Sequence, residues 1–260
     1  MKNQKYLKAC AERIALKVLK TKKNKKFFQK PFKHLIVDNL IDKNFAIKCM
    51  KDFPSIKKKI FWEKSNIKSI EIKYRSIWNS EFDIPENMAS LVRILNSSIF
   101  LKALSKVFSI PKIMPDPYFT GGGLNITERG GLLDVHVDGN YHDASGLNRR
   151  LNILIYFNPG WKKSWGGEFG IYSHNGKKCM KKIEPLFNRM IVFDTHDYSF
   201  HGLPNPINFP KNKLRKSLIL YYYTREKRPK KQTKISKPHS ALWLKKNFLD
   251  KKGKVVRRYS

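Results

Sequence analysis

The first 110 residues carry apolar residues at helical spacing. Over residues 5–20 the apolar positions recur every three or four residues with lysines between them, which predicts an amphipathic helix. Those positions are Leu7, Ala11, Ile14 and Val18. Residues 42–53 predict a second helix that ends before Pro54, and residues 85–107 predict one or two more. We expect the first helix to pack on the rest of the protein, with binding to a membrane surface as the alternative.

From Ile113 the apolar period changes to two, and short apolar runs alternate with Gly, Pro and Asn turns. The clearest runs are 132–137, 151–157, 190–193 and 215–223. Residues 32–40 suggest one earlier strand and turn, whereas the lysine-rich residues 55–84 show no clear pattern. The whole pattern predicts an α+β protein that is mainly β: a double-stranded β-helix, or jelly roll, backed by N-terminal helices.

Four regions follow from these patterns. They are a basic amphipathic helix and linker (1–33), a helical support region (34–110), the jelly-roll domain (111–224), and a basic C-terminal tail with a short amphipathic helix over 241–249 (225–260). A chain of 260 residues is long enough for a core of ordinary size.

The chain carries a formal net charge of +34, and two-thirds of it lies at the ends. Residues 1–33 contribute +11 and residues 225–260 contribute +12. Basic ends of this kind could bind a polyanion, either nucleic acid or an acidic protein. The alternative is a lysine-rich composition with no dedicated partner.

The sequence also bears on the compartment. It has no apolar run long enough to span a membrane and no signal-peptide pattern at its start. Its cysteines, Cys10, Cys49 and Cys179, are scattered and fit neither a disulfide framework nor a zinc site. We therefore expect a cytoplasmic protein.

His136 and Asp138 are the first candidates for chemistry. Residues i and i+2 of a strand share one face, so an imidazole and a carboxylate project side by side from the run 132–137. A second histidine would complete a 2-His-1-carboxylate site for iron, although the two-residue motif alone is weak evidence. His196 and His201 compete for that place, and we expect His201, which follows the run 190–193 and precedes Gly202.

Arg215 and Ser217 share one face of the last apolar run. Inside a barrel, this pair could bind a carboxylate through a charged fork and a hydroxyl. Tyr156 could add its phenol to the same carboxylate. The alternatives are a surface arginine at the start of a strand and a tyrosine that only packs in the core.

Six segments together resemble the Fe(II)/2-oxoglutarate-dependent dioxygenases, in the branch similar to prolyl 4-hydroxylases. They are PDPYFTGGGLN (115–125), GGLLDVHVDGNYH (130–142), RRLNILIYFNPGW (149–161), WGGEFGIY (165–172), FDTHDYSFHGLP (193–204) and RKSLILYYYT (215–224). They follow the order of the family over residues 111–224, under half of the chain.

The resemblance implies a role for each candidate. His136, Asp138 and His201 correspond to iron ligands, Arg215 to the residue that binds the distal carboxylate of 2-oxoglutarate, and Tyr156 to a pocket tyrosine. The implied cofactors are Fe(2+), 2-oxoglutarate as co-substrate and O2, with ascorbate as an optional addition.

The resemblance implies hydroxylation of an unactivated C–H bond, favouring a prolyl residue of a peptide or protein, with release of succinate and CO2. A carboxylate at Asp138 argues for hydroxylation, since glycine or alanine there would leave room for a halide. Gly139 departs from related sequences, which often carry a bulkier residue, and we expect it to widen the substrate side of the pocket.

Several alternatives stay open. A hydroxylase of the same family could act on a small molecule, a sugar or a lipid-linked substrate. A jelly roll could also be a scaffold for a non-catalytic nucleic-acid-binding protein, or for a cupin-like metal isomerase that needs no arginine for 2-oxoglutarate. We expect His142 and Asp143 to lie at the mouth or on the surface, and His34, His174 and His239 to be structural or solvated.

Overall fold

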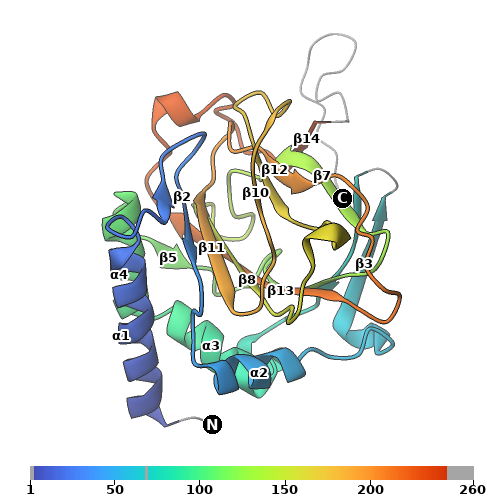
Figure 1. Ribbon diagram of the computed structural model, residues 1–260. Helices are drawn as coiled ribbons and strands as arrows, with labels where there is room; N and C mark the ends of the chain where they lie inside the picture. The colour runs from blue at the N-terminus through green and yellow to red at the C-terminus, as the bar shows by residue number, and fades with distance from the viewer. Residues whose placement is uncertain (1–2, 68–69, 245–260) are drawn as a thin grey trace.

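A computed structural model describes residues 3–67 and 70–244 of the chain (Figure 1). Its helices in this part are α1 (Gln4–Lys20), α2 (Lys43–Lys51), α3 (Glu86–Leu95) and α4 (Ser98–Phe108). The strands up to residue 127 are β1 (Phe27–Phe28), β2 (His34–Val37), β3 (Trp62–Ile67), β4 (Glu71–Ser76), β5 (Met114–Pro115) and β6 (Gly123–Thr127). The remaining strands are β7 (Leu132–Val137), β8 (Asn148–Tyr156), β9 (Phe169–Tyr172), β10 (Cys179–Ile183), β11 (Arg189–Asp194), β12 (His201–Leu203), β13 (Arg215–Thr224) and β14 (Leu242–Trp243).

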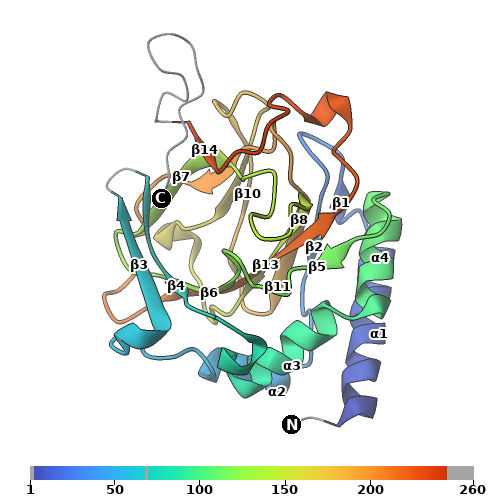
Figure 2. The same cartoon turned by 180° about the vertical axis from the view of Figure 1, so that it is seen from behind.

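The strands form one curled antiparallel sheet. Its order is β1-β2-β11-β8-β13-β6-β4-β7-β12-β9-β10, with β3 beside β4, β5 beside β13 and β14 beside β7. The sheet folds over on itself, so that apolar side chains of β9 and β10 pack against those of β8 and β11. Figure 2 shows the resulting sandwich from behind, with the helices outside one layer. This is the jelly roll that the period of two predicted, and the fold class is confirmed.

Residues on the central strands alternate between two environments. One face of β8 and β13 packs under the helices in the main core: Leu151, Ile153, Ile155, Leu218, Leu220 and Tyr222. The opposite face of the same strands lines a cavity between the layers: Arg149, Asn152, Leu154, Arg215, Ser217, Ile219, Tyr221 and Tyr223. The pleat therefore separates residues that support the fold from residues that can touch a ligand.

Helix α1 packs against α4 and α3. Its predicted apolar stripe is buried, from Leu7 at 7% exposed to Val18 at 0%. This stripe is part of the core and is not free to lie on a membrane surface. Among residues 3–67 and 70–244, no helix combines the length and the apolar character that crossing a bilayer requires.

Three segments differ from the sequence predictions. Residues 55–84, which showed no pattern, contain the β3–β4 hairpin beside β6 and β7. The linker after α1 contains the short strand β1, which pairs with β2. The helix predicted over 241–249 is wrong at its start, because Leu242 and Trp243 form β14; residues 245–249 lie outside the described residues.

Candidate active site

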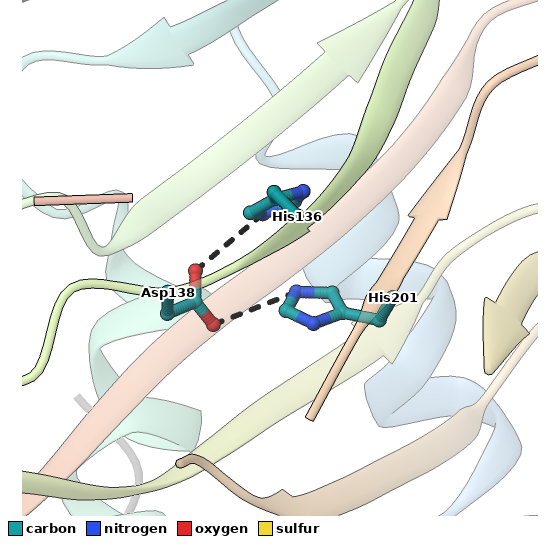
Figure 3. A group of neighbouring side chains, drawn as sticks. All are labelled: His136, Asp138 and His201. Atoms are coloured by element: carbon teal, nitrogen blue, oxygen red, sulfur yellow. Dashed lines mark ion pairs between the residues drawn. The ribbon is translucent and has the colours of Figure 1, made fainter. Parts of the chain in front are cut away.

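His136, Asp138 and His201 meet at one point inside the sandwich (Figure 3). His136 lies near the end of β7, Asp138 directly after it, and His201 opens β12 opposite His136 in the antiparallel register. The Oδ1 atom of Asp138 is 3.5 Å from Nε2 of His136, and its Oδ2 atom is 3.5 Å from Nε2 of His201. The three ligand atoms lie within 4.8 Å of one another, and all three residues are buried.

Hydrogen bonds fix the tautomer of both imidazoles. The Nδ1 atom of His136 lies 2.8 Å from the carbonyl oxygen of Asp134, and Nδ1 of His201 lies 2.9 Å from that of Ser199. A carbonyl only accepts, so each Nδ1 must donate. In the neutral ring the Nε2 atom then carries a lone pair, and both lone pairs face Asp138.

The charge state agrees with this arrangement. Burial lowers the pKa of His201 to about 4, against the attraction of Asp138, so its ring is neutral at neutral pH. Burial alone would raise the pKa of Asp138, but His201 and His136 outweigh it and hold that pKa well below its usual range. Two imidazole Nε2 atoms and a carboxylate thus converge in one buried place, a donor set that fits a divalent cation.

Two residues that the sequence did not single out surround Asp138. Asn152 on β8 donates from Nδ2 to Oδ2 of Asp138 at 2.5 Å, which fixes the carboxylate. Nη1 of Arg149 lies 4.0 Å from Oδ1 of Asp138, and the guanidinium carbon stacks 4.0 Å from the centre of the Tyr221 ring. Both residues face inward on β8 near the chain reversal after Asp138.

The cavity beside this group has a volume of about 490 Å³ and extends to Arg215 and Ser217. Arg215 is 5% exposed; its Nε donates to the carbonyl of Gly167 at 2.9 Å, and its Nη2 donates to the hydroxyl of Tyr156 at 3.4 Å. Within the described part of the chain, Arg215 has no ion pair with an acidic side chain. A buried cation without an anionic partner is costly, so this end of the cavity fits an anion.

Ser217 and Tyr156 differ in their relation to the cavity. Ser217 is buried on the same face of β13 and lines the cavity with Arg215. Tyr156 lies behind Arg215, with its ring centre 5.0 Å from the guanidinium carbon, and is not one of the lining residues. Burial raises the pKa of the Tyr156 hydroxyl, which stays protonated. Tyr156 is therefore placed to orient Arg215, and not to contact a ligand in the cavity.

The other histidines have structural partners. His196 stands outside the group: its Nδ1 accepts from the Tyr198 amide at 3.2 Å, its ring packs edge-on against Phe32, and burial lowers its pKa to about 3. His142 was expected at the mouth or on the surface: it lines the cavity but is only 2% exposed, and its Nε2 lies 2.9 Å from Oδ1 of Asp116. Asp143 is exposed, as expected.

Gly139 does not widen the pocket. A Cβ atom there would lie 2.9 Å from the carbonyl oxygen of His239 and 3.3 Å from Cα of Ser240. The space beside Gly139 is therefore filled by the backbone of the C-terminal segment. His239 itself is buried, with Nε2 3.2 Å from Oδ1 of Asp197.

Comparisons with known proteins agree with this site. Residues 122–223 match the model of the 2OG-Fe(II) oxygenase superfamily. In sequence, the prolyl 3-hydroxylase OGFOD1 of Mus musculus is 25% identical over 77 residues, which cover 28% of this chain and 14% of that protein. The match thus spans only about a seventh of the length of this curated relative.

Two solved structures share the fold. A prolyl hydroxylase from Trichoplax adhaerens, solved with a peptide fragment of the hypoxia inducible factor oxygen degradation domain, has a TM-score of 0.54 at 15% identity and covers 86% of this chain and 94% of its own. A Pseudomonas putida prolyl-4-hydroxylase has a TM-score of 0.51 at 13% identity and covers 82% of this chain and 99% of its own.

The jelly roll thus holds a buried His–Asp–His group, of the kind that can bind a metal ion, beside a cavity. Residues 122–223 match the 2OG-Fe(II) oxygenase superfamily, and the chain shares its fold with prolyl hydroxylases. The resemblance seen in the sequence is confirmed. Fe(II) and 2-oxoglutarate, which give this family its name, fit the donor set and the cavity described above.

Proposed function

We propose that the chain is an Fe(II)- and 2-oxoglutarate-dependent dioxygenase that hydroxylates a prolyl residue of a peptide or protein, with release of succinate and CO2. One observation carries this proposal. Three metal-ligand atoms converge beside a cavity whose other end presents the buried guanidinium of Arg215, which has no acidic partner among the described residues. A cation site and an anion site in one cavity suit a metal and a dicarboxylate bound together.

Each residue then has a defined task. His136, Asp138 and His201 would hold the iron, and Asp138 supplies the negative charge that balances it. Arg215 and Ser217 would bind the far carboxylate of 2-oxoglutarate, while Tyr156 and the Gly167 carbonyl keep the guanidinium in place. Bound Fe(II), with 2-oxoglutarate and O2, supplies the oxidising chemistry, and the chain contributes orientation and exclusion of water.

A peptide substrate is supported by the lining of the cavity. Tyr221 and Trp243 offer aromatic surface for an apolar ring. Lys73, Arg75 and Arg149 also line it and can donate to backbone carbonyls, although Lys73 and Arg75 each have a glutamate partner, Glu71 and Glu63. The fold that the chain shares with a prolyl hydroxylase solved with a peptide points the same way. An uncharged sugar would make less use of these cationic side chains.

The decisive assay is release of labelled succinate from 2-oxoglutarate with Fe(II), run across proline-containing peptides and matched peptides with alanine in place of proline. We expect turnover to rise only with a proline peptide, and mass spectrometry to find one added oxygen atom on that proline. Asp138→Ala protein is the matched control for metal-independent background. If no 2-oxoglutarate is consumed under any condition, the proposed function is wrong.

We also propose that the basic N-terminal region binds a polyanion. Lysines 20, 22, 23 and 25 are all exposed at the end of α1 and in the turn after it. Deleting this region is a poor test, because α1 contributes buried residues to the core. Substitution of single side chains keeps the core intact.

Replacing Lys22, Lys23 and Lys25 together by glutamine is therefore expected to weaken binding to a labelled single-stranded RNA. The slope of log K against log salt should fall by up to about 2, since each lost phosphate contact removes about 0.7. The same change at Lys57, Lys58 and Lys59, also exposed, is the matched control. Equal effects of the two triple variants would show that RNA binding depends only on total charge, and would contradict a binding site in the N-terminal region.

A further inference from the structure

The segment 225–244, named here the C-terminal strap, folds back onto the site. After β13 it crosses the sandwich and ends as β14, which pairs antiparallel with β7, so that Trp243 stands opposite His136 and Leu242 opposite Val137. Figure 2 shows β14 beside β7 at the end of the red part of the chain. The amide of Leu244 extends this pairing by donating to the carbonyl of Val135 at 2.7 Å.

The middle part of the strap is held in place by Asp197, a carboxylate only 3% exposed. Its oxygens accept from Nη1 of Arg228 at 2.9 Å and from the amides of Lys234 at 2.7 Å and Ile235 at 2.9 Å, and lie 3.2 Å from Nε2 of His239. Charge-assisted hydrogen bonds of this kind are among the strongest in proteins. Since Asp197 is four residues before His201, the strap is tied to the loop that presents one of the metal-site histidines.

The other attachment follows Asp138 directly. The side chain of Asn140 accepts from the amide of His239 at 2.8 Å and donates to the carbonyl of Lys237 at 3.0 Å. The Asn140 amide donates to the carbonyl of His239 at 3.1 Å. Gly139 permits this close approach, because a Cβ there would collide with the same carbonyl. The strap is thus hydrogen-bonded to both segments that present the metal-site residues: to Asp197, before His201, and to Asn140, after Asp138.

Trp243 places its ring on His136. The two ring centres are 4.5 Å apart with an interplanar angle of 30°, while the His201 ring lies 4.4 Å from His136. Trp243 also lines the cavity, together with Ser240 and Ala241. The hydrogen bond to the Asp134 carbonyl fixes the tautomer of His136, and the contact with Trp243 restricts the tilt of its ring.

We propose that the strap is a working part of the site: Trp243 is a positioning residue for His136, and its ring is one wall of the substrate cavity. The first half requires only that the site binds a metal ion. The second half rests on the proposed function, because it requires a substrate in the cavity.

The first half is tested with Co(II) alone on full-length protein, by calorimetry and tryptophan fluorescence. Trp243→Ala should weaken Co(II) binding about tenfold, as removal of groups that orient metal ligands commonly does, whereas Trp243→Phe should keep the affinity within about threefold. Trp243→Phe should also lose most of the fluorescence quenching by Co(II). Trp78→Phe is the matched control, since Trp78 packs edge-on against Phe119, away from the cavity.

The second half is tested by kinetics with the proline peptide. Trp243→Ala should raise the KM for the peptide about tenfold and leave the KM for 2-oxoglutarate unchanged, with partial rescue in Trp243→Phe. Thermal unfolding monitors the fold of each variant, and the aromatic substitution is expected to fold even if alanine does not.

The outcomes separate this inference from the proposed function. If Trp243→Ala binds Co(II) like wild type and Trp243→Phe is quenched as strongly as Trp78→Phe, the positioning role is wrong. If the Co(II) results are as expected but wild type consumes no 2-oxoglutarate, the positioning role stands and the proposed function falls. An unchanged peptide KM in an active Trp243→Ala protein would show that the Trp243 ring does not contact the substrate.

Discussion

Asp138→Ala is expected to abolish 2-oxoglutarate turnover, with a loss of at least about 10³-fold, equal to about 4 kcal/mol of transition-state stabilisation. Asp138 is the anionic member of the group, and both of its oxygens face an imidazole lone pair. Without it, two neutral imidazoles must hold a divalent cation in a buried place with no charge to balance it. Co(II) calorimetry and succinate release measure the two effects separately.

Stability distinguishes this loss from misfolding. In the metal-free protein the two histidines lower the pKa of Asp138, and Asn152 donates to its carboxylate, so Asp138→Ala removes favourable contacts. We expect the metal-free variant to unfold cooperatively, at a lower temperature than wild type, and Co(II) to raise the unfolding temperature of wild type only. If the variant is unfolded, misfolding explains its inactivity and the experiment gives no evidence for metal binding by Asp138.

The histidines give the matched comparison. His136→Ala and His201→Ala should each be as inactive as Asp138→Ala, whereas His196→Ala should retain most activity, because His196 packs against Phe32 outside the group. An inactive His196→Ala together with an active His201→Ala would show that the third ligand is wrongly assigned.

Most of the site could be predicted from the spacing of residues within single strands. His136 and Asp138 share one strand, and the pleat alone places them side by side. Arg215 and Ser217 follow the same rule on β13. The contact of His201 with His136 depends on the register of β12 against β7, which no local pattern reveals. The turn residues after His201 favoured it over His196, and the resemblance to a family agreed with that choice.

The sequence did not reveal residues whose contacts depend on pairing between distant strands. Asn152 reads as a polar interruption of an apolar strand, and its contact with Asp138 appears only when β8 lies across the cavity from the end of β7. The β3–β4 hairpin has mostly exposed or half-buried side chains, so its strands lack a strong apolar alternation. Pairing with neighbouring strands, more than intrinsic pattern, defines such a hairpin.

The strap shows the same limit. Arg228 and His239 look like members of a basic tail, and their shared partner Asp197 lies 31 and 42 residues away in the sequence. Leu242 and Trp243 have spacing that suits a helix, yet hydrogen bonding to β7 makes them a strand. Tertiary contact overrides a weak local preference over so short a segment.

Arg215→Ala is expected to raise the KM for 2-oxoglutarate by about tenfold to a few hundredfold. Each charge-assisted bond contributes roughly 1.5–3 kcal/mol, and about 1.4 kcal/mol corresponds to one decade of affinity. Arg215 is buried and has no acidic partner among the described residues, so its removal leaves a ligand carboxylate unpaired in a closed cavity. Arg215→Lys should be intermediate, because an ammonium keeps the charge and loses the planar fork.

Two controls make the Arg215 measurement specific. Tyr156→Phe removes only the hydroxyl that accepts from Nη2 of Arg215, so it should raise the 2-oxoglutarate KM by a few-fold at most, close to the strength of one long hydrogen bond. Co(II) affinity should be unchanged in Arg215→Ala, because Arg215 is not part of the metal-site group. Calorimetry of 2-oxoglutarate with Mn(II) present compares the variants directly. Equal binding by wild type and Arg215→Ala would remove the co-substrate role from Arg215 and favour the cupin-like alternative, whereas a selective loss of 2-oxoglutarate binding is what a dioxygenase requires.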